Sequence, residues 1–233
     1  MKPYTNEIPK CLIPINNIPL LQHWLNLLSD QGFSEVLINT HYLSKLVDKF
    51  IKKNIYKYPK LKITLKFEKT LLGTAGTVWN NKNFIGDGNC FIINTDVISN
   101  IDLIKFYNFH KKRKQIITIG YMKTENTKGC GEIKINKNLI VTKFKEKPKL
   151  SFSKYIYSGI QIINSNIFEL ESFVKFNNSK ISNLDFGYDI YPMILGQIAG
   201  YGLKCFAFDI GNIKSYQSVN EFWSNSNQIL KYE

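Results

Sequence analysis

Five short segments of this chain hold residue types that could take part in chemistry. Each contains a lysine, a carboxylate or a glycine, and each is too short to be informative alone. The segments are Ile8–Ile15 (IPKCLIPI), Leu71–Gly76 (LLGTAG), Asn94–Asp96 (NTD), Lys145–Pro148 (KEKP) and Phe208–Gly211 (FDIG). Carboxylates bind hard divalent cations, lysine supplies a flexible positive charge, and glycine lets the backbone approach a flat ligand closely.

Cysteine and histidine do not provide a zinc or redox site. The four cysteines are Cys11, Cys90, Cys130 and Cys205, and the three histidines are His23, His41 and His110. The cysteines form no CxxC pair and the histidines do not cluster, so the spacing expected of a zinc site is absent. A bound metal is therefore expected to be a hard cation held by carboxylates and phosphate oxygens.

Alternating helix and strand patterns must position these segments. Residues 20–28 and 42–53 place apolar side chains on one helix face. The apolar runs at 35–39 and 90–94 predict buried strands, and 63–68 is strand-like. This order predicts an α/β fold with a doubly wound, mostly parallel, Rossmann-like sheet, whose ligands bind at the carboxyl ends of the strands. From about residue 121 the short strands at 131–135, 139–144 and 155–163 predict a more mixed lobe.

In this order and spacing, the five segments resemble the sugar-1-phosphate nucleotidylyltransferase family, and most closely its mannose- or heptose-1-phosphate guanylyltransferase-like members. The resemblance spans nearly the whole chain. It implies one nucleotidyltransferase domain over residues 1–233, with a nucleotide-binding part to about residue 122 and a sugar-phosphate-binding part from about 123. In that reaction a sugar-phosphate oxygen attacks the α-phosphorus of a nucleoside triphosphate and pyrophosphate leaves, so the protein positions and neutralises two polyanions.

The resemblance assigns the metal-binding carboxylates to Asp96 and Asp209, with Mg²⁺ as the cofactor. It also implies that Lys10 approaches the triphosphate, that Lys147 contacts the sugar phosphate and that Glu146 hydrogen-bonds sugar hydroxyls. The alternatives are plain ones: Asp is common in turns, and many of the 31 basic residues must be solvated on the surface. Asp102, which precedes a helical pattern, is the better candidate for a helix cap.

Substrate-binding positions follow from the same resemblance. Leu72, Gly73 and Thr74 match a base-binding loop, and Glu68 at the preceding strand end is placed to assist. The alternatives are a glycine turn ahead of a helix and a solvated strand end. The residues that match the lining of a sugar pocket are Gly131, Ser158 and Gly159. Two positions depart from the family: Tyr157 stands where relatives often have Asn, and Thr95 where they have Gly or Ala.

The largest departure from the family is at the start of the chain. Family members open with a buried strand and a Gly-x-Gly-Thr-Arg-type loop that holds the triphosphate. Met1–Lys10 aligns directly after that loop, so about twenty residues of the usual strand-loop unit are missing from this sequence. Neighbouring strands are expected to expose unpaired edges. Either Met1 is an internal methionine or the chain is catalytically impaired, and we favour the first.

Composition bounds the remaining choices. The net charge of +13 raises the possibility of nucleic-acid binding, but lysine is spread along the chain and only Lys111–Lys114 forms a tight basic run. We therefore expect an enzyme for anionic substrates, with no nucleic-acid partner. No apolar run is long enough for a membrane span and no signal peptide is seen, so a cytoplasmic protein is expected. The oligomeric state is not readable.

The sequence thus predicts transfer of a nucleoside monophosphate to a sugar 1-phosphate, giving a nucleoside-diphosphate sugar for surface polysaccharide. Guanylyl transfer to mannose or heptose 1-phosphate is favoured, and thymidylyl or uridylyl transfer stays open. The rival interpretation is a nucleotide- or sugar-binding regulatory homologue that keeps the fold without turnover.

Overall fold

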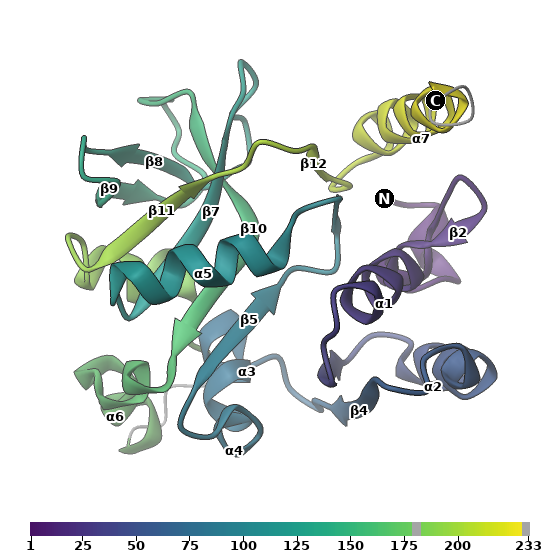
Figure 1. Cartoon of the computed structure of the whole chain (residues 1–233), viewed down its shortest axis with the longest axis horizontal. Helices are drawn as coiled ribbons and strands as arrows, with labels where there is room; N and C mark the ends of the chain where they lie inside the picture. The colour runs from purple at the N-terminus through teal and green to yellow at the C-terminus, as the bar shows by residue number, and fades with distance from the viewer. Residues whose placement is uncertain (179–182, 230–233) are drawn as a thin grey trace. The chain divides into compact units, whose positions relative to one another are not determined.

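The computed structural model describes residues 1–178 and 183–229 and has the mixed α/β character expected from the sequence. The chain forms two compact units (Figure 1). Unit 1 contains Met1–Lys69, Asn94–Asn100 and Cys205–Glu233, and unit 2 contains Thr70–Ile93 and Ile101–Lys204. Each unit therefore collects segments that are distant in the sequence, and each is described separately below. The division near residue 122 stays a prediction.

Unit 1 begins with a small hairpin and an amphipathic helix. Strands β1 (Pro14–Ile15) and β2 (Ile18–Pro19) pair antiparallel and lead into α1 (Leu20–Asp30). The buried face of α1 consists of the apolar residues that the sequence pattern placed there: Leu20, Leu21, Trp24, Leu25 and Leu28. The indole Nε1 of Trp24 donates a hydrogen bond of 2.7 Å to the carbonyl of Val97, which fixes α1 against the strand that follows Asp96.

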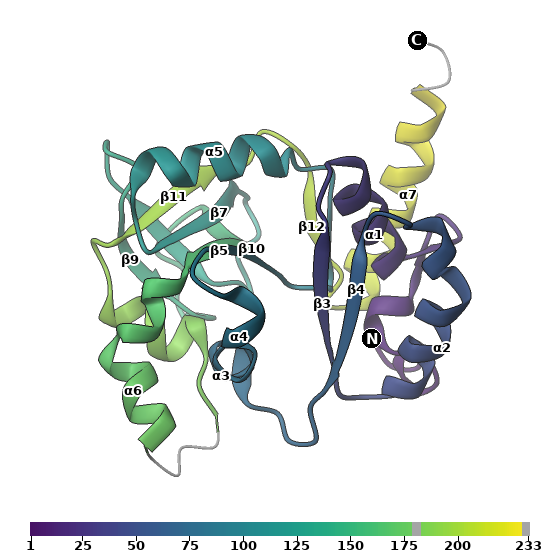
Figure 2. The ribbon, with the colours of Figure 1, turned by 60° about the horizontal axis from the view of Figure 1, so that its bottom comes forward.

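A parallel strand pair follows in unit 1. Strands β3 (Glu35–Thr40) and β4 (Lys62–Phe67) lie side by side, connected by α2 (Ser44–Asn54) (Figure 2). The helix α2 begins two residues later than the pattern indicated, because Leu43 has a φ of 50° and cannot join the helix. The last part of unit 1 pairs β6 (Val97–Ser99) with β12 (Ala207–Asp209) and ends in α7 (Ile213–Ile229).

Unit 2 is built on a mixed sheet whose longest strand is β10 (Tyr155–Asn164). Its neighbours are antiparallel: β5 (Asn89–Ile93), β7 (Ile117–Lys123) and β8 (Glu132–Ile135). Strand β9 (Val141–Lys145) extends the sheet beyond β8, and β11 (Ile198–Gly202) pairs parallel with β7. The mixed lobe expected after residue 121 is thus present, although its sheet also takes in β5 from the preceding part of the chain.

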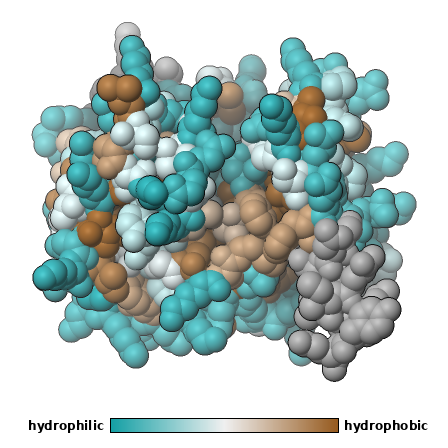
Figure 3. Space-filling model, turned by 90° about the horizontal axis from the view of Figure 1, so that it is seen from above, coloured by the Kyte–Doolittle hydropathy of each residue, from teal (hydrophilic) through white to brown (hydrophobic). Residues whose placement is uncertain are grey.

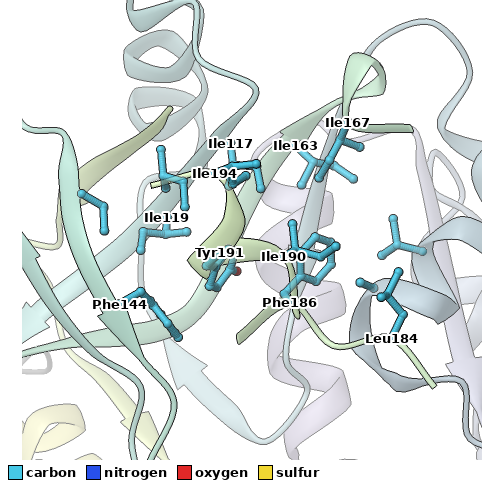
Figure 4. Close-up of a cluster of buried hydrophobic side chains, with 14 of the residues drawn as sticks. Ile117, Ile119, Phe144, Ile163, Ile167, Leu184, Phe186, Ile190, Tyr191 and Ile194 are labelled. Atoms are coloured by element: carbon cyan, nitrogen blue, oxygen red, sulfur yellow. The ribbon is translucent and has the colours of Figure 1, made fainter. Parts of the chain in front are cut away.

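Helices surround this sheet and close its core. They are α3 (Gly73–Asn80), α4 (Lys82–Ile85), α5 (Leu103–Arg113) and α6 (Glu171–Asn178). Asp102 caps α5 by accepting a hydrogen bond from the Lys105 N–H, as expected, and the basic run occupies the last turn, where the helix dipole favours cations. The core contains Ile117, Ile163, Phe186 and Tyr191 among other apolar residues (Figure 4).

Strands β3 and β5 each have one paired edge, as do the other outer strands of the described sheets. Within residues 1–178 and 183–229, β3 pairs only with β4 and β5 pairs only with β10. Every residue of β5 is half-exposed, although the sequence predicted a buried strand there. The missing N-terminal strand stays a prediction.

Figure 3 shows one face of the molecule, on which hydrophilic side chains lie beside apolar areas. Among the described helices, none combines the length and the apolar character required to span a bilayer.

Candidate functional site

Asp96 and Asp209 come together in unit 1, although 113 positions separate them in the sequence. The antiparallel pairing of β6 with β12 sets Asp209 opposite Val97, and the Ile210 N–H donates a hydrogen bond of 2.8 Å to the Asp96 carbonyl. Gly211 follows Asp209 directly, and a Cβ at that position would collide with Oδ1 of the Asp209 carboxylate. Glycine is therefore required there for the side-chain position that Asp209 adopts.

Lys10 joins this pair of carboxylates. It begins a short 3-10 helix, Lys10–Leu12, after Pro9. Its Nζ lies 2.7 Å from Oδ2 of Asp96, and both side chains are 32% exposed, so the ion pair is accessible to a ligand. We call Lys10, Asp96 and Asp209 the acidic site. The sequence assigned these residues to one site, and the fold places the lysine directly on the first carboxylate.

The donor set of the acidic site fits a hard cation bound jointly with a phosphate ligand. Two carboxylates supply the oxygen ligands that Mg²⁺ prefers, and Mg²⁺ usually takes one or two carboxylates together with substrate phosphates and water. Among residues 1–178 and 183–229, no group of three or more His, Cys, Asp or Glu side chains is arranged to hold a metal by itself. The protein residues alone therefore do not make a closed metal cage.

Glu68 lies in unit 1 at the end of β4 and is buried rather than solvated. Its side chain is 6% exposed, its N–H donates to the Thr40 carbonyl at 2.8 Å, and its carbonyl contacts Nδ1 of His41 at 2.7 Å. The solvated-strand-end alternative is thus wrong for Glu68.

A second group of predicted residues gathers in unit 2 around Glu146. Glu146 and Lys147 follow β9, with Lys147 Nζ 3.6 Å from the Glu146 carboxylate. The Lys147 N–H donates to the Cys130 carbonyl at 3.2 Å, and the carbonyl of the next residue, Gly131, accepts from Tyr157 N–H at 2.8 Å. A Cβ on Gly131 would lie 2.8 Å from Glu146 Oε2, so this glycine makes room for the carboxylate.

The sequence analysis missed Asp185, which lies beside Glu146. Between them is Gly187, whose absent Cβ would lie 2.8 Å from Glu146 Oε2 and 3.2 Å from Asp185 Oδ1. Burial raises the pKa of Glu146; the Asp185 charge also raises it, whereas the Lys147 ammonium acts in the opposite direction. We call Glu146, Lys147 and Asp185 the carboxylate cluster. The carboxylate-glycine pattern Asp185–Gly187 was the available signal, and it resembles that of Asp209–Gly211.

Asp185 is held rigidly. Its Oδ1 accepts hydrogen bonds from the N–H groups of Gly187 and Tyr188, at 2.7 and 3.1 Å. Its Oδ2 accepts from the Thr74 hydroxyl at 2.8 Å, and that hydroxyl in turn accepts from the Phe186 N–H at 2.9 Å. The Thr74 hydroxyl therefore contacts the carboxylate cluster, and the base-binding role of Thr74 stays a prediction.

The glycine loop before α3 is packed against residue 184. Leu184 N–H donates to the Leu72 carbonyl at 2.8 Å, and the Leu184 carbonyl accepts from the N–H groups of Ala75 and Gly76, both at 2.9 Å. Gly73 has a φ of 77° and would clash with Leu184 if it carried a side chain. Two amides at the start of α3 are therefore occupied within the protein, so any base contact must come from other atoms of this loop.

Ser158 and Gly159 lie at an irregularity in β10. The register with β7 shifts between Tyr157 and Gln161, and Gly159 has a φ of 78° there. The buried Ser158 hydroxyl has no hydrogen-bond partner in the described part of the chain and points toward Gly120, which leaves room for it by lacking a Cβ. Ser158 is thus directed into the sheet interior.

Aromatic residues pack next to the carboxylate cluster. Tyr157, the departure from the family pattern, packs edge-on against Phe144 and Tyr191. Tyr191 donates a hydrogen bond to Gln161 Oε1. Burial raises the pKa of Tyr191 well above its usual value, with further contributions from Tyr157, Asp185 and Glu146. Tyr191 and Gln161 are both buried, so this phenol and amide satisfy each other in the interior next to the cluster.

A family model described as "Nucleotidyl transferase" matches residues 1–226. The chain belongs to this nucleotidyltransferase family. The family expected from the sequence motifs is thereby confirmed.

Two curated relatives illustrate the similarity. Mannose-1-phosphate guanylyltransferase 1 of Arabidopsis thaliana is 30% identical over 173 residues, which cover 72% of this chain and 48% of the relative. The mannose-1-phosphate guanyltransferase of Aspergillus oryzae is 26% identical over 224 residues, covering 94% and 59%. The chain therefore spans about half to three fifths of the length of these relatives.

Solved structures confirm the fold. HddC from Yersinia pseudotuberculosis, complexed with GMP-PN, aligns with a TM-score of 0.78 at 22% identity, covering 96% of this chain and 93% of that one. A UDP-glucose pyrophosphorylase complexed with UDP-glucose aligns with a TM-score of 0.80 at 18% identity, covering 97% and 94%. At these identities the likeness establishes the α/β nucleotidyltransferase fold and not a substrate.

Proposed function

We propose that this chain transfers a nucleoside monophosphate from a nucleoside triphosphate to a sugar 1-phosphate. A phosphate oxygen of the sugar 1-phosphate forms a bond to the α-phosphorus, the bond from that phosphorus to the bridging oxygen of the β-phosphate breaks, and pyrophosphate leaves with the electron pair. Guanylyl transfer to mannose or heptose 1-phosphate is favoured because curated relatives are named as mannose-1-phosphate guanylyltransferases. Thymidylyl and uridylyl transfer are the alternatives.

The observation that carries the proposal is the acidic site. A lysine ammonium 2.7 Å from one carboxylate, with a second carboxylate on the adjacent strand, gives the mixed charge that a metal-nucleotide complex needs. Asp96 and Asp209 would hold Mg²⁺, which supplies neutralisation of the charge on phosphate oxygens. Lys10 would leave Asp96 for the triphosphate when the substrate binds, so the ion pair keeps the lysine extended and close to its target.

The carboxylate cluster suits a ligand that combines several hydroxyl groups with one phosphate. Carboxylate oxygens accept hydrogen bonds and cannot donate them when ionised, so Glu146 and Asp185 would select hydroxyl donors. The Lys147 ammonium would take the phosphate, and it offsets the repulsion that two acids exert on an anionic ligand. Gly131 and Gly187 leave the space in which Glu146 lies. These roles make a sugar 1-phosphate the ligand proposed for the cluster.

A panel assay tests the proposal. Pyrophosphate release would be measured with GTP, ATP, UTP and dTTP, each paired with mannose, glucose and heptose 1-phosphates, with and without Mg²⁺. We expect release with at least one pair, only in the presence of a divalent cation, and highest with GTP. Absence of release from every pair, in the chain as given and in an N-terminally extended form, would overturn the proposal.

A nucleotide- or sugar-binding regulatory role is the second candidate, as in the sequence-based hypothesis. Turnover only in the extended form would support the enzyme. Nucleotide or sugar-phosphate binding without turnover in either form would support the regulatory role. The use of the product in surface polysaccharide and the cytoplasmic location remain predictions from the sequence.

A further inference from the structure

Glu132 and Glu68 are the two buried carboxylates in the described part of the chain. Within that part, Glu132 forms no ion pair. Its side chain is 1% exposed, and it lies in β8 opposite Lys145 of β9 and Ile156 of β10. Burying a carboxylate is costly unless several hydrogen bonds replace its water. Hydrogen bonds to the Glu132 carboxylate must therefore offset the cost of its burial.

The hydrogen bonds of Glu132 run to the segment that returns from Lys147. Its Oε2 accepts from the N–H groups of Phe152 and Ser153, at 2.7 and 3.0 Å. Burial by itself would raise the pKa of Glu132, but hydrogen bonds from the Thr127 and Ser151 hydroxyls and from these two amides outweigh it and lower that pKa. Glu132 is thus ionised at neutral pH, and its charge is directed at the backbone of 151–153.

The segment 147–153 is held at both ends by residues at the start of β8 or just before it. Its first residue, Lys147, has a φ of 43° and donates its N–H to the Cys130 carbonyl. Its last residues are held by Glu132, two positions further along. Between these ends, Lys149 and Leu150 are exposed, Leu150 by 86%. The Glu132 carboxylate therefore fixes the backbone at the far end of the segment.

Phe152 adds a second contact at the same end. Lys143 Nζ lies 4.2 Å from the centre of its ring and Lys134 Nζ lies 6.0 Å away, both from the β8–β9 pair. The ring thus rests on two neighbouring strands while Glu132 holds its amide. These contacts set the path of the chain that leads back to Lys147.

We infer that Glu132 is a positioning residue for Lys147: by clasping the amides of residues 152 and 153, it holds the segment that aims the Lys147 ammonium at the phosphate of a sugar 1-phosphate. The inference rests on the proposed function of the carboxylate cluster. Glu132 itself does not contact the ligand, because it is buried beneath the segment.

A double-mutant cycle tests this inference. The affinity for mannose 1-phosphate would be measured by calorimetry for the wild type, Glu132→Gln, Lys147→Ala and the double variant. Glutamine keeps one acceptor oxygen, so the protein stays folded, but it loses the charge that shortens and strengthens these bonds. We expect Glu132→Gln to weaken binding about 3- to 10-fold and to have no further effect once Lys147 is alanine. Binding of GTP should not change.

Controls separate a positioning role from a merely structural one. Glu125→Gln removes a carboxylate from an exposed ion pair with Lys154 and should leave the affinity for mannose 1-phosphate unchanged. Amide hydrogen exchange at 152 and 153 should speed up in Glu132→Gln and stay slow in Glu125→Gln. The inference is wrong if Glu132→Gln weakens mannose 1-phosphate binding equally in the wild-type and Lys147→Ala backgrounds. It is also wrong if Glu132→Gln alters neither that affinity nor amide exchange at 152 and 153. If Lys147→Ala alone does not weaken binding, the assignment of the sugar phosphate to Lys147 fails first, and the inference falls with it.

Discussion

Replacing Gly187 by alanine would test whether Glu146 and Asp185 recognise a sugar together. The new methyl group would lie 2.8 Å from Glu146 Oε2 and 3.2 Å from Asp185 Oδ1, closer than the 3.4 Å at which ordinary contact begins. Asp185 cannot give way, because three hydrogen bonds from Gly187, Tyr188 and Thr74 hold it. Glu146 must therefore retreat, by roughly 0.6 Å on the separations above.

The magnitude follows from which group moves. Forcing a methyl group into a packed region costs about 1–3 kcal/mol of folding free energy, and relief by the Glu146 side chain places the cost at the lower end. Losing a hydrogen bond to a charged group costs about 1.5–3 kcal/mol, which corresponds to roughly 10- to 100-fold weaker binding of the sugar phosphate. We therefore expect a large loss of affinity with a small loss of stability.

Calorimetric titration with mannose 1-phosphate, together with urea unfolding, would measure both quantities. Gly88→Ala is the matched control, since Gly88 has an ordinary φ and its Cβ would meet nothing closer than the Ile85 carbonyl at 4.0 Å. It should leave both quantities unchanged. The reasoning is refuted if Gly187→Ala binds the sugar phosphate like the wild type while remaining folded.

Three further predictions concern other parts of the chain. Burial lowers the pKa of His110 from 6.5 to about 4. Its contribution to the free energy of unfolding should therefore be constant above pH 6.5 and decrease by about 3 kcal/mol as the pH falls to 4. Urea unfolding between pH 7.5 and 4.5 should show a shallower fall in His110→Gln, and an equal fall would contradict the prediction. Gly211→Ala should displace the Asp209 carboxylate and reduce turnover at least about 10-fold, as measured by pyrophosphate release; normal turnover would count against the acidic site. Thr74→Val should weaken mannose 1-phosphate binding about 5- to 10-fold, because Asp185 loses a hydrogen bond, and should leave GTP affinity unchanged. A loss of GTP affinity alone would support the predicted base-binding role of Thr74.

Local patterns predicted the regular elements of the fold well. The apolar spacing over residues 20–28 matched the buried face of α1, and Asp102 capped α5, because both depend on neighbours within a few positions. The start of α2 was displaced by a left-handed residue that no periodicity reveals. The half-exposure of β5 was also missed, since burial of a strand depends on which neighbours it acquires.

The candidate site was only partly readable from the sequence. Motif order brought Asp96 and Asp209 into one hypothesis, and the β6–β12 pairing then gave it a physical basis. Asp185 and the contact of its carboxylate with Thr74 were not readable, because they join residues 111 positions apart through side chains. Side-chain contacts between distant residues depend on tertiary packing, and the spacing within a motif does not predict them.

The most direct test of the central claim is Mg²⁺-dependent pyrophosphate release by Asp96→Asn and Asp209→Asn variants of an active form of the protein. Asparagine keeps the size of each side chain and removes the charge that would hold the cation and, at Asp96, pair with Lys10. We predict that both variants retain the unfolding midpoint of the parent to within a few degrees and lose at least about 100-fold in turnover, because electrostatic stabilisation of this kind typically supplies that much. Undiminished turnover in both variants, with the same dependence on Mg²⁺, would contradict the assignment of Asp96 and Asp209 to the reaction.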